Sequence, residues 1–280
     1  MHRAISHTPL HSAANALLSQ WHLIEDGQPI LTASSLLMPV TRDGSPAMLK
    51  ITSDPDELRG NHLMVLWDGQ GAAAVMEHDQ GALLLERAVS NRTLADFVYA
   101  DLDDEATRKL CETAKLLHSA SLLQQTDMRS LDRWFADLLE LPPNSAEWIK
   151  DCARQARDLL SDPREPITLH GDLHHGNILD FGARGWRAID PKGLYGERAA
   201  DFAALFLNPD LADPQRPYAA SPKRFEHRVR QVSSHAMIEP ARLLRWIHAW
   251  SGLSAVWFME EGIVPETQQA VAHLAIQALA

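Results

Sequence analysis

The sequence predicts an α+β fold with two lobes. A small lobe with an antiparallel β-sheet and one helix is expected at residues 1–90, and a larger, mainly helical lobe at residues 91–280. Short apolar segments separated by turn residues dominate residues 21–90, whereas apolar residues recur at helical spacing beyond Asn91. The 280-residue chain also reaches the length, about 250–300 residues, at which one hydrophobic core stops growing and chains divide.

The strands of the first lobe are predicted from their turns. Two apolar segments, residues 30–38 and 47–51, flank the turn Thr41-Arg-Asp-Gly44 and predict a hairpin. Residues 72–77 and 82–86 predict two further short strands, which are separated by a glycine turn. Together these segments predict a small antiparallel sheet.

One helix is predicted between the two pairs of strands. Asp54 is a suitable N-cap and Pro55 a suitable first helical residue, and Glu57 stands three residues after the cap, as in a capping box. The helix is expected to end at Asp68-Gly69.

The second lobe is predicted to be helical with one embedded hairpin. Helical periodicity covers residues 106–117, 149–159, 241–259 and 266–279, and short strands are expected at residues 178–181 and 186–189. Trp246, Trp250 and Trp257 lie on one face of a predicted helix, which indicates core packing.

The composition limits the classes of function. There are 26 Lys and Arg against 37 Asp and Glu, a formal charge of −11, which argues against binding of nucleic acid and permits a cationic small molecule. Cys111 and Cys152 are too few for a disulfide framework or a zinc cluster, and no apolar stretch approaches the ~20 residues of a membrane span. A cytoplasmic protein without a membrane partner is expected.

The motif with the most chemical content runs from His170 to Asp190. Asp172 follows a short apolar segment, Asn177 comes five residues later, and Asp190 comes eighteen residues after Asp172. Phosphoryl transfer from ATP needs a carboxylate at the acceptor hydroxyl, oxygen ligands for Mg²⁺ and a cation at the phosphates. Asp172, Asn177 and Asp190 meet the first two needs, and Lys50 meets the third, with Glu57 as its possible partner.

His170-Gly-Asp-Leu-His-His-Gly-Asn177 and Ile189-Asp-Pro191 resemble the aminoglycoside phosphotransferase branch of the protein-kinase-like fold. Within that branch the chain is similar to the streptomycin 6-kinase and hydroxyurea kinase group. This similarity lies in Asp56-Glu-Leu-Arg-Gly60, Trp67-Asp-Gly-Gln-Gly71, Leu83-Leu-Leu-Glu-Arg-Ala88, Asp190-Pro-Lys-Gly193 and Gly196-Glu-Arg-Ala-Ala-Asp201.

The resemblance implies an ATP- and Mg²⁺-dependent kinase that phosphorylates a hydroxyl of a small polar molecule, with streptomycin-type aminoglycosides first among the acceptors. It implies that Asp172 is the catalytic base and that Asn177 and Asp190 are Mg²⁺ ligands. Lys50, held by Glu57, would contact the ATP phosphates.

The resemblance also implies supporting roles at the edges of this site. Glu86-Arg-Ala88 would be the hinge between the lobes, where Glu86 and Ala88 contact adenine through the backbone. His170 and Asp201 would support the catalytic loop. The sequence has no Gly-rich phosphate loop at residues 30–46; Thr32-Ala-Ser-Ser35 is the nearest substitute, and Ser34 and Ser35 are candidate phosphate donors.

Several alternatives stay open from the sequence. Glu57 has a second interpretation as a capping-box residue, and Glu260 and Glu261 are either acceptor contacts or solvated charges at a helix end. His174 and His175, with His170, also suggest a zinc hydrolase, although the flanking glycines disfavour the helix that such a site needs. The acceptor could instead be hydroxyurea, a sugar or an amino alcohol, and a catalytically silent nucleotide-binding protein is a further alternative. The oligomeric state is not predicted.

Overall fold

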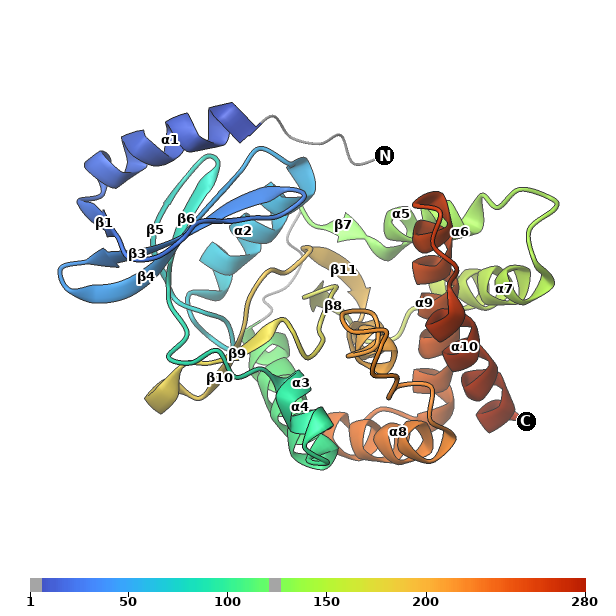
Figure 1. The fold of residues 1–280 in the computed structure, drawn as a ribbon. Helices are drawn as coiled ribbons and strands as arrows, with labels where there is room; N and C mark the ends of the chain where they lie inside the picture. The colour runs from blue at the N-terminus through green and yellow to red at the C-terminus, as the bar shows by residue number, and fades with distance from the viewer. Residues whose placement is uncertain (1–6, 121–126) are drawn as a thin grey trace.

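The computed structural model describes residues 7–120 and 127–280. A six-stranded antiparallel sheet with two helices forms one part of the molecule, and most helices lie in the other (Figure 1). The sheet consists of β1 (Leu23–Glu25), β2 (Ile30–Leu31), β3 (Ser35–Arg42), β4 (Ser45–Thr52), β5 (Val75–Asp79) and β6 (Ala82–Glu86). Its strand order is β1-β3-β4-β6-β5, with β2 paired to β3. The predicted α+β fold is confirmed.

The β3–β4 hairpin lies where the sequence predicts it, but two of its boundaries differ. Arg42 pairs with Ser45, so the turn is the residue pair Asp43–Gly44, both with positive φ, as a two-residue hairpin loop requires. Residues 30–38 are not one strand, because a turn at residues 32–35 divides them into β2 and β3.

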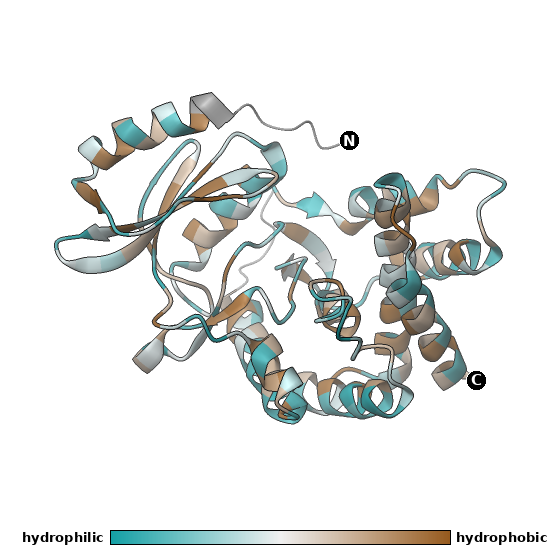
Figure 2. Ribbon diagram, viewed as in Figure 1, coloured by the Kyte–Doolittle hydropathy of each residue, from teal (hydrophilic) through white to brown (hydrophobic). Residues whose placement is uncertain are grey.

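The two faces of the sheet bury different helices. α1 (His7–Gln20) and the following residue place Leu10, Leu17 and Trp21 in one core cluster with Leu49 and Ile51 of β4. Along α1 brown and teal segments alternate, as expected of a helix that buries one face (Figure 2). Because side chains alternate along a strand, Lys50 lies on the opposite face, where α2 (Pro55–Trp67) packs.

The remaining elements form the mainly helical part. They are α3 (Leu94–Tyr99), α4 (Asp103–Ala120), β7 (Arg129–Ser130), α5 (Leu131–Trp134), α6 (Ala136–Leu139), α7 (Glu147–Ser161), β8 (Pro166–Leu169), β9 (Ile178–Asp180), β10 (Trp186–Ala188), β11 (Leu194–Glu197), α8 (Pro222–Ala236), α9 (Pro240–Glu260) and α10 (Glu266–Leu279). Short 3₁₀ helices span Gly182–Arg184, Arg198–Phe202 and Ala204–Leu207.

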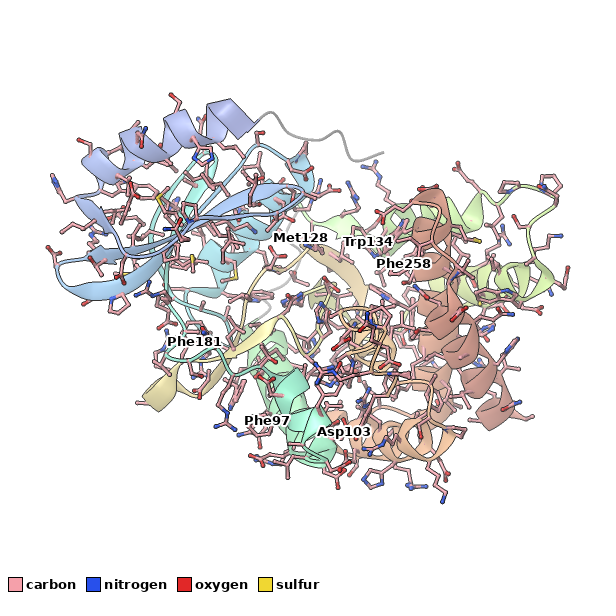
Figure 3. All side chains as sticks on the ribbon, in the orientation of Figure 1. Phe97, Asp103, Met128, Trp134, Phe181 and Phe258 are labelled. Atoms are coloured by element: carbon pink, nitrogen blue, oxygen red, sulfur yellow. The ribbon has the colours of Figure 1, made fainter. Side chains whose placement is uncertain are left out.

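Aromatic packing and buried ion pairs hold these helices together. Trp246 and Trp250 are buried edge-to-face against Phe135, which confirms the core role predicted for these two tryptophans. Asp103 lies at the start of α4, where α4 meets α8 (Figure 3), and its carboxylate binds buried Arg228 at 2.7 Å. In the described ranges 7–120 and 127–280, no helix has the length and apolarity that crossing a bilayer demands.

Candidate active site

β4 and α2 bring Lys50 and Glu57 together. The Asp54 carboxylate caps α2 by accepting the backbone N–H groups of Asp56 and Glu57, which places Glu57 in the first turn. Lys50 Nζ lies 2.5 Å from Glu57 Oε2, and both side chains are about nine-tenths buried. The capping-box interpretation of Glu57 is wrong. A capping box needs the Glu57 carboxylate to accept the Asp54 N–H, but that N–H donates to Thr52 Oγ1, and the Glu57 carboxylate binds Lys50.

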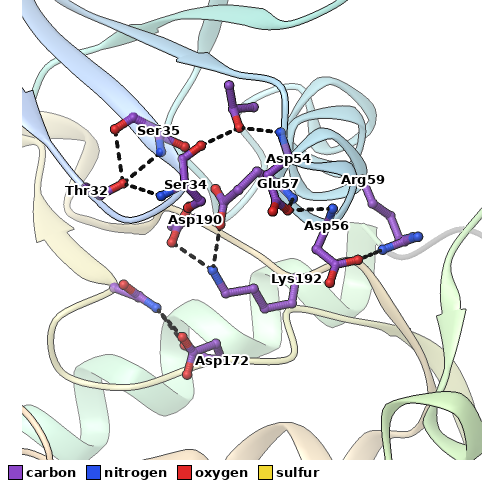
Figure 4. Close-up of polar contacts among 12 residues, drawn as sticks. Thr32, Ser34, Ser35, Asp54, Asp56, Glu57, Arg59, Asp172, Asp190 and Lys192 are labelled. Carbon is purple, nitrogen blue, oxygen red and sulfur yellow. Dashed lines mark hydrogen bonds and ion pairs between the residues drawn. The ribbon is translucent and has the colours of Figure 1, made fainter. Parts of the chain in front are cut away.

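Asp190 and Lys192 complete a ring of four alternating charges with this pair. Lys50 Nζ lies 2.6 Å from Asp190 Oδ1, and Lys192 Nζ lies 3.0 Å from Asp190 Oδ2 and 3.2 Å from Glu57 Oε1. Figure 4 shows Lys192 between the two carboxylates. Burial alone would raise the pKa of Asp190, but Lys50 and Lys192 hold that pKa well below its usual range.

Lys192 was not among the residues predicted from the sequence. Burial would lower its pKa, yet the nearby carboxylates of Asp190, Glu57 and Asp172 raise the pKa above the ordinary lysine value, so Lys192 is charged. The available signal was a lysine two residues after the candidate metal carboxylate. Its contact with Glu57 could not be read from the sequence, because 135 residues separate them.

The loop between β8 and β9 carries Asp172 and Asn177. Asn177 Nδ2 donates to the backbone oxygen of Asp172 at 2.9 Å and to its Oδ2 at 3.2 Å. The Asn177 carbonyl accepts the N–H of Ile189, the residue before Asp190. Burial would raise the pKa of Asp172, but the contact with His174 and the charge of Lys192 lower it below its usual value.

His170 connects the two segments of the site. Its Nδ1 accepts the Asp172 N–H at 3.2 Å, and its Nε2 lies 2.9 Å from the Ile189 carbonyl, which assigns the proton to Nε2. The ring is fully buried, and burial lowers its pKa. The same imidazole therefore positions the residues around Asp172 and Asp190.

Asp201 lies beneath the same loop. Its buried carboxylate accepts the backbone N–H groups of His170 at 3.1 Å and Gly171 at 2.7 Å, and it contacts His118 Nε2 at 2.8 Å. Burial would raise its pKa, but these hydrogen bonds and the nearby histidines lower it. His118, on α4, was not predicted as a site residue.

The three histidines of the motif have separate environments. His170 is engaged as above, His174 Nδ1 accepts the Gly176 N–H with its Nε2 3.6 Å from Asp172 Oδ2, and His175 is fully buried. Over residues 7–120 and 127–280, no group of three or more His, Cys, Asp or Glu side chains is arranged to hold a metal. The zinc hypothesis therefore finds no ligand set there.

Ser34 and Ser35 lie in the turn between β2 and β3. Thr32 Oγ1 accepts both of their backbone N–H groups, at 3.3 and 2.9 Å, so the turn consumes these donors (Figure 4). The Ser35 hydroxyl is buried and has no hydrogen-bond partner among the described residues. Thr52 Oγ1 donates to the Ser34 carbonyl at 2.6 Å, and this bond ties the turn to the start of α2.

Arg184, which the sequence did not indicate as a site residue, holds the connection after β6. This arginine lies in the 3₁₀ helix between β9 and β10 and binds the Glu86 carboxylate, which also accepts the Ala74 N–H at 2.7 Å. Arg184 also donates to the Gly69 carbonyl. Ala88 is half-buried against the core.

Glu260 and Glu261 lie apart from this group in their contacts. Both are exposed at the C-terminal end of α9. Within the part of the chain that the structure describes, neither carboxylate contacts a residue of the charged ring or the catalytic loop.

Some known proteins are similar to this chain in sequence, and others are similar in fold. Residues 20–262 match the family described as aminoglycoside/hydroxyurea antibiotic resistance kinase. Streptomycin 3''-kinase of Klebsiella pneumoniae is 48% identical over 94% of this chain and 98% of that protein. Streptomycin 6-kinase of Streptomyces glaucescens is 30% identical over 90% and 84%. Choline kinase LicA from Streptococcus pneumoniae has a TM-score of 0.63 at 14% identity, covering 98% of this chain and 99% of that chain, a likeness of fold alone.

Proposed function

The chain belongs to the aminoglycoside/hydroxyurea antibiotic resistance kinase family, and we propose that it transfers the γ-phosphate of ATP to a hydroxyl of a streptomycin-type aminoglycoside. Its fold is protein-kinase-like, as the motif implied. The observation that carries the proposal is the charged ring of Lys50, Glu57, Asp190 and Lys192 beside Asp172. A cytoplasmic location, where ATP is available, belongs to the same proposal.

The donor set at Asp190 and Asn177 fits Mg²⁺. Asp190 offers a carboxylate that is 35% exposed, and Asn177 turns its amide nitrogen to Asp172, which leaves the amide oxygen as an acceptor. Mg²⁺ takes hard oxygen ligands from one or two protein groups and keeps phosphate oxygens and water for the rest. Asn177 and Asp190 would hold the ion, which supplies neutralisation of phosphate charge.

Asp172 is the proposed base for the acceptor hydroxyl. Its lowered pKa keeps the carboxylate ionised at neutral pH. Asn177 and His174 lie at Oδ2, whereas Oδ1 has no hydrogen-bond partner within residues 7–120 and 127–280. Asp172 can therefore accept the hydroxyl proton through Oδ1 while Asn177 orients the carboxylate, so the rate gain comes mainly from positioning.

Lys50 is proposed to neutralise the ATP phosphates, and Glu57 to hold Lys50 in place. The segment Glu86-Arg-Ala88 is proposed to contact adenine through its backbone, with the Glu86 side chain fixed by Arg184. His170 and Asp201 are proposed to hold the Asp172 loop through the hydrogen bonds described above.

Streptomycin is the proposed acceptor, and the 3''-hydroxyl is the proposed position. The 48% identity to a streptomycin 3''-kinase over nearly the whole chain supports this position over the 6-hydroxyl, since the streptomycin 6-kinase, whose group the sequence resembles, is 30% identical. The net charge of −11 suits a cationic acceptor.

The test is ATP turnover by the purified protein with streptomycin, with the product located by mass spectrometry and NMR. Hydroxyurea, choline and a neutral sugar are offered in parallel. Asp172→Asn should lower kcat by about 100-fold or more, whereas Asp158→Asn, an exposed residue of α7, should not change kcat. The proposal is contradicted if the wild-type protein does not phosphorylate streptomycin, or if Asp172→Asn leaves kcat unchanged.

A further inference from the structure

Lys192 has no part in the function proposed above, although it lies in the same charged ring as Lys50. We propose that Lys192 is a second phosphate-binding cation, whose ammonium group binds the nucleotide phosphates together with that of Lys50. This inference rests on the proposed ATP-dependent function and names a further residue of the same site.

The backbone around Lys192 is fixed on both sides. The Lys192 N–H donates to the His170 carbonyl at 2.7 Å, and the Gly193 carbonyl accepts the Arg129 N–H at 3.0 Å. Pro191, the preceding residue, packs against α2 at Gly60. The Lys192 side chain therefore extends from a fixed main chain to the carboxylates of Asp190 and Glu57.

Both oxygens of the Asp190 carboxylate already contact an ammonium group. Lys50 lies at Oδ1 and Lys192 at Oδ2. A divalent ion held by Asp190 would take the place of one of these two lysines. Lys50 is also held by the buried Glu57 at 2.5 Å, whereas Lys192 lies 3.2 Å from that residue, so Lys192 is the lysine with the weaker hold. A lysine released from Asp190 beside bound phosphates meets the anionic oxygens it is suited to bind.

The net charge of the ring also favours a phosphate-binding role for Lys192. Two lysines and two carboxylates make the ring neutral, whereas Mg·ATP brings two negative charges to it. Removal of Lys192 leaves a net negative ring that repels the phosphates. A merely structural Lys192, which only balances Glu57, would become dispensable once Glu57 is made neutral, and this difference separates the two roles.

The experiment measures binding rather than turnover. Binding of the non-hydrolysable analogue AMP-PNP with Mg²⁺ is measured by calorimetry. The proteins are wild type, Lys192→Met, Glu57→Gln and the double variant. Lys223→Met, at an exposed lysine of α8, controls for the loss of one positive charge. Thermal unfolding of each variant establishes that it is folded.

We expect an affinity about 10- to 100-fold lower in Lys192→Met, as for the loss of a charge-assisted hydrogen bond. The same loss should appear when Lys192→Met is made in the Glu57→Gln background. An unchanged affinity in Lys192→Met, or a loss that disappears beside Glu57→Gln, would overturn the inference. If Lys192→Met does not fold, Lys192→Gln, which removes the charge but keeps a hydrogen-bond donor, gives the same test. Wild type that binds no analogue would overturn the proposed function as well.

Discussion

Replacement of Gly60 by alanine tests how closely α2 must approach the Asp190 segment. A Cβ atom at Gly60 would lie 1.9 Å from the Pro191 carbonyl oxygen, which is backbone and cannot rotate away. Carbon–oxygen contacts normally begin at about 3.3 Å, so α2 and this segment must separate by about 1.4 Å. The Lys192–Glu57 distance of 3.2 Å would then grow beyond the roughly 4 Å limit of an ion pair.

Two effects oppose each other in the stability of Gly60→Ala. Alanine inside a helix is favoured over glycine by about 1 kcal/mol, whereas overpacking costs about 1–3 kcal/mol. The net loss in unfolding free energy should therefore be at most about 2 kcal/mol. Activity should fall much further, by about 100-fold in kcat/KM, because displacement of a reacting group by about 1 Å has that effect.

Urea unfolding and coupled ADP release with streptomycin measure the two quantities on the same preparation. His62→Ala, an exposed position of α2, controls for a general change in the helix. If Gly60→Ala is more stable than wild type and retains its kcat/KM, then α2 adjusts freely and the close contact with Pro191 does not position Glu57.

Three further predictions concern other contacts of the site. Thr52→Val removes the hydroxyl between the β2–β3 turn and the start of α2, so KM for ATP should rise about 5- to 10-fold, and Thr52→Ser should restore it; equal KM in Thr52→Val would contradict this role. Asp201→Asn should cost about 2–4 kcal/mol at pH 7 in urea unfolding. Because the folded pKa of Asp201 is lowered, its stabilisation is present above the unfolded value of about 3.9 and is lost as pH falls through the folded pKa, so the two unfolding curves should converge only in acid. Glu260→Gln with Glu261→Gln should leave KM for streptomycin within about twofold, because both side chains are exposed; a larger rise would make them acceptor contacts.

Elements with local causes were predictable from the sequence. Asp54 caps α2 as expected, since a cap depends on residues within one turn of the helix. The predicted hairpin turn, Thr41–Gly44, begins two residues too early. Thr41 and Arg42 belong to β3, and only Asp43 and Gly44, both with positive φ, form the turn. The helix α1 was missed, although Leu10, Leu17 and Trp21 recur at helical spacing.

The missed site residues have partners that are distant in the sequence. Arg184 binds Glu86 from 98 residues away, and His118 meets Asp201 from 83 residues away. Neither arginine nor histidine at these positions has a local pattern that marks it. The folding of separate segments against one another creates these contacts.

The sequence by itself determined the order and spacing of Asp172, Asn177 and Asp190, because all three lie in one continuous segment of the chain. It also determined that Lys50 stands on a strand, seven residues before Glu57 in the first turn of the next helix. Only the tertiary structure decided that Glu57 binds lysines rather than its own helix cap, and that Lys192 joins the ring. The physical reason is that a buried carboxylate takes the cations that packing brings to it, and packing joins segments that the sequence keeps far apart.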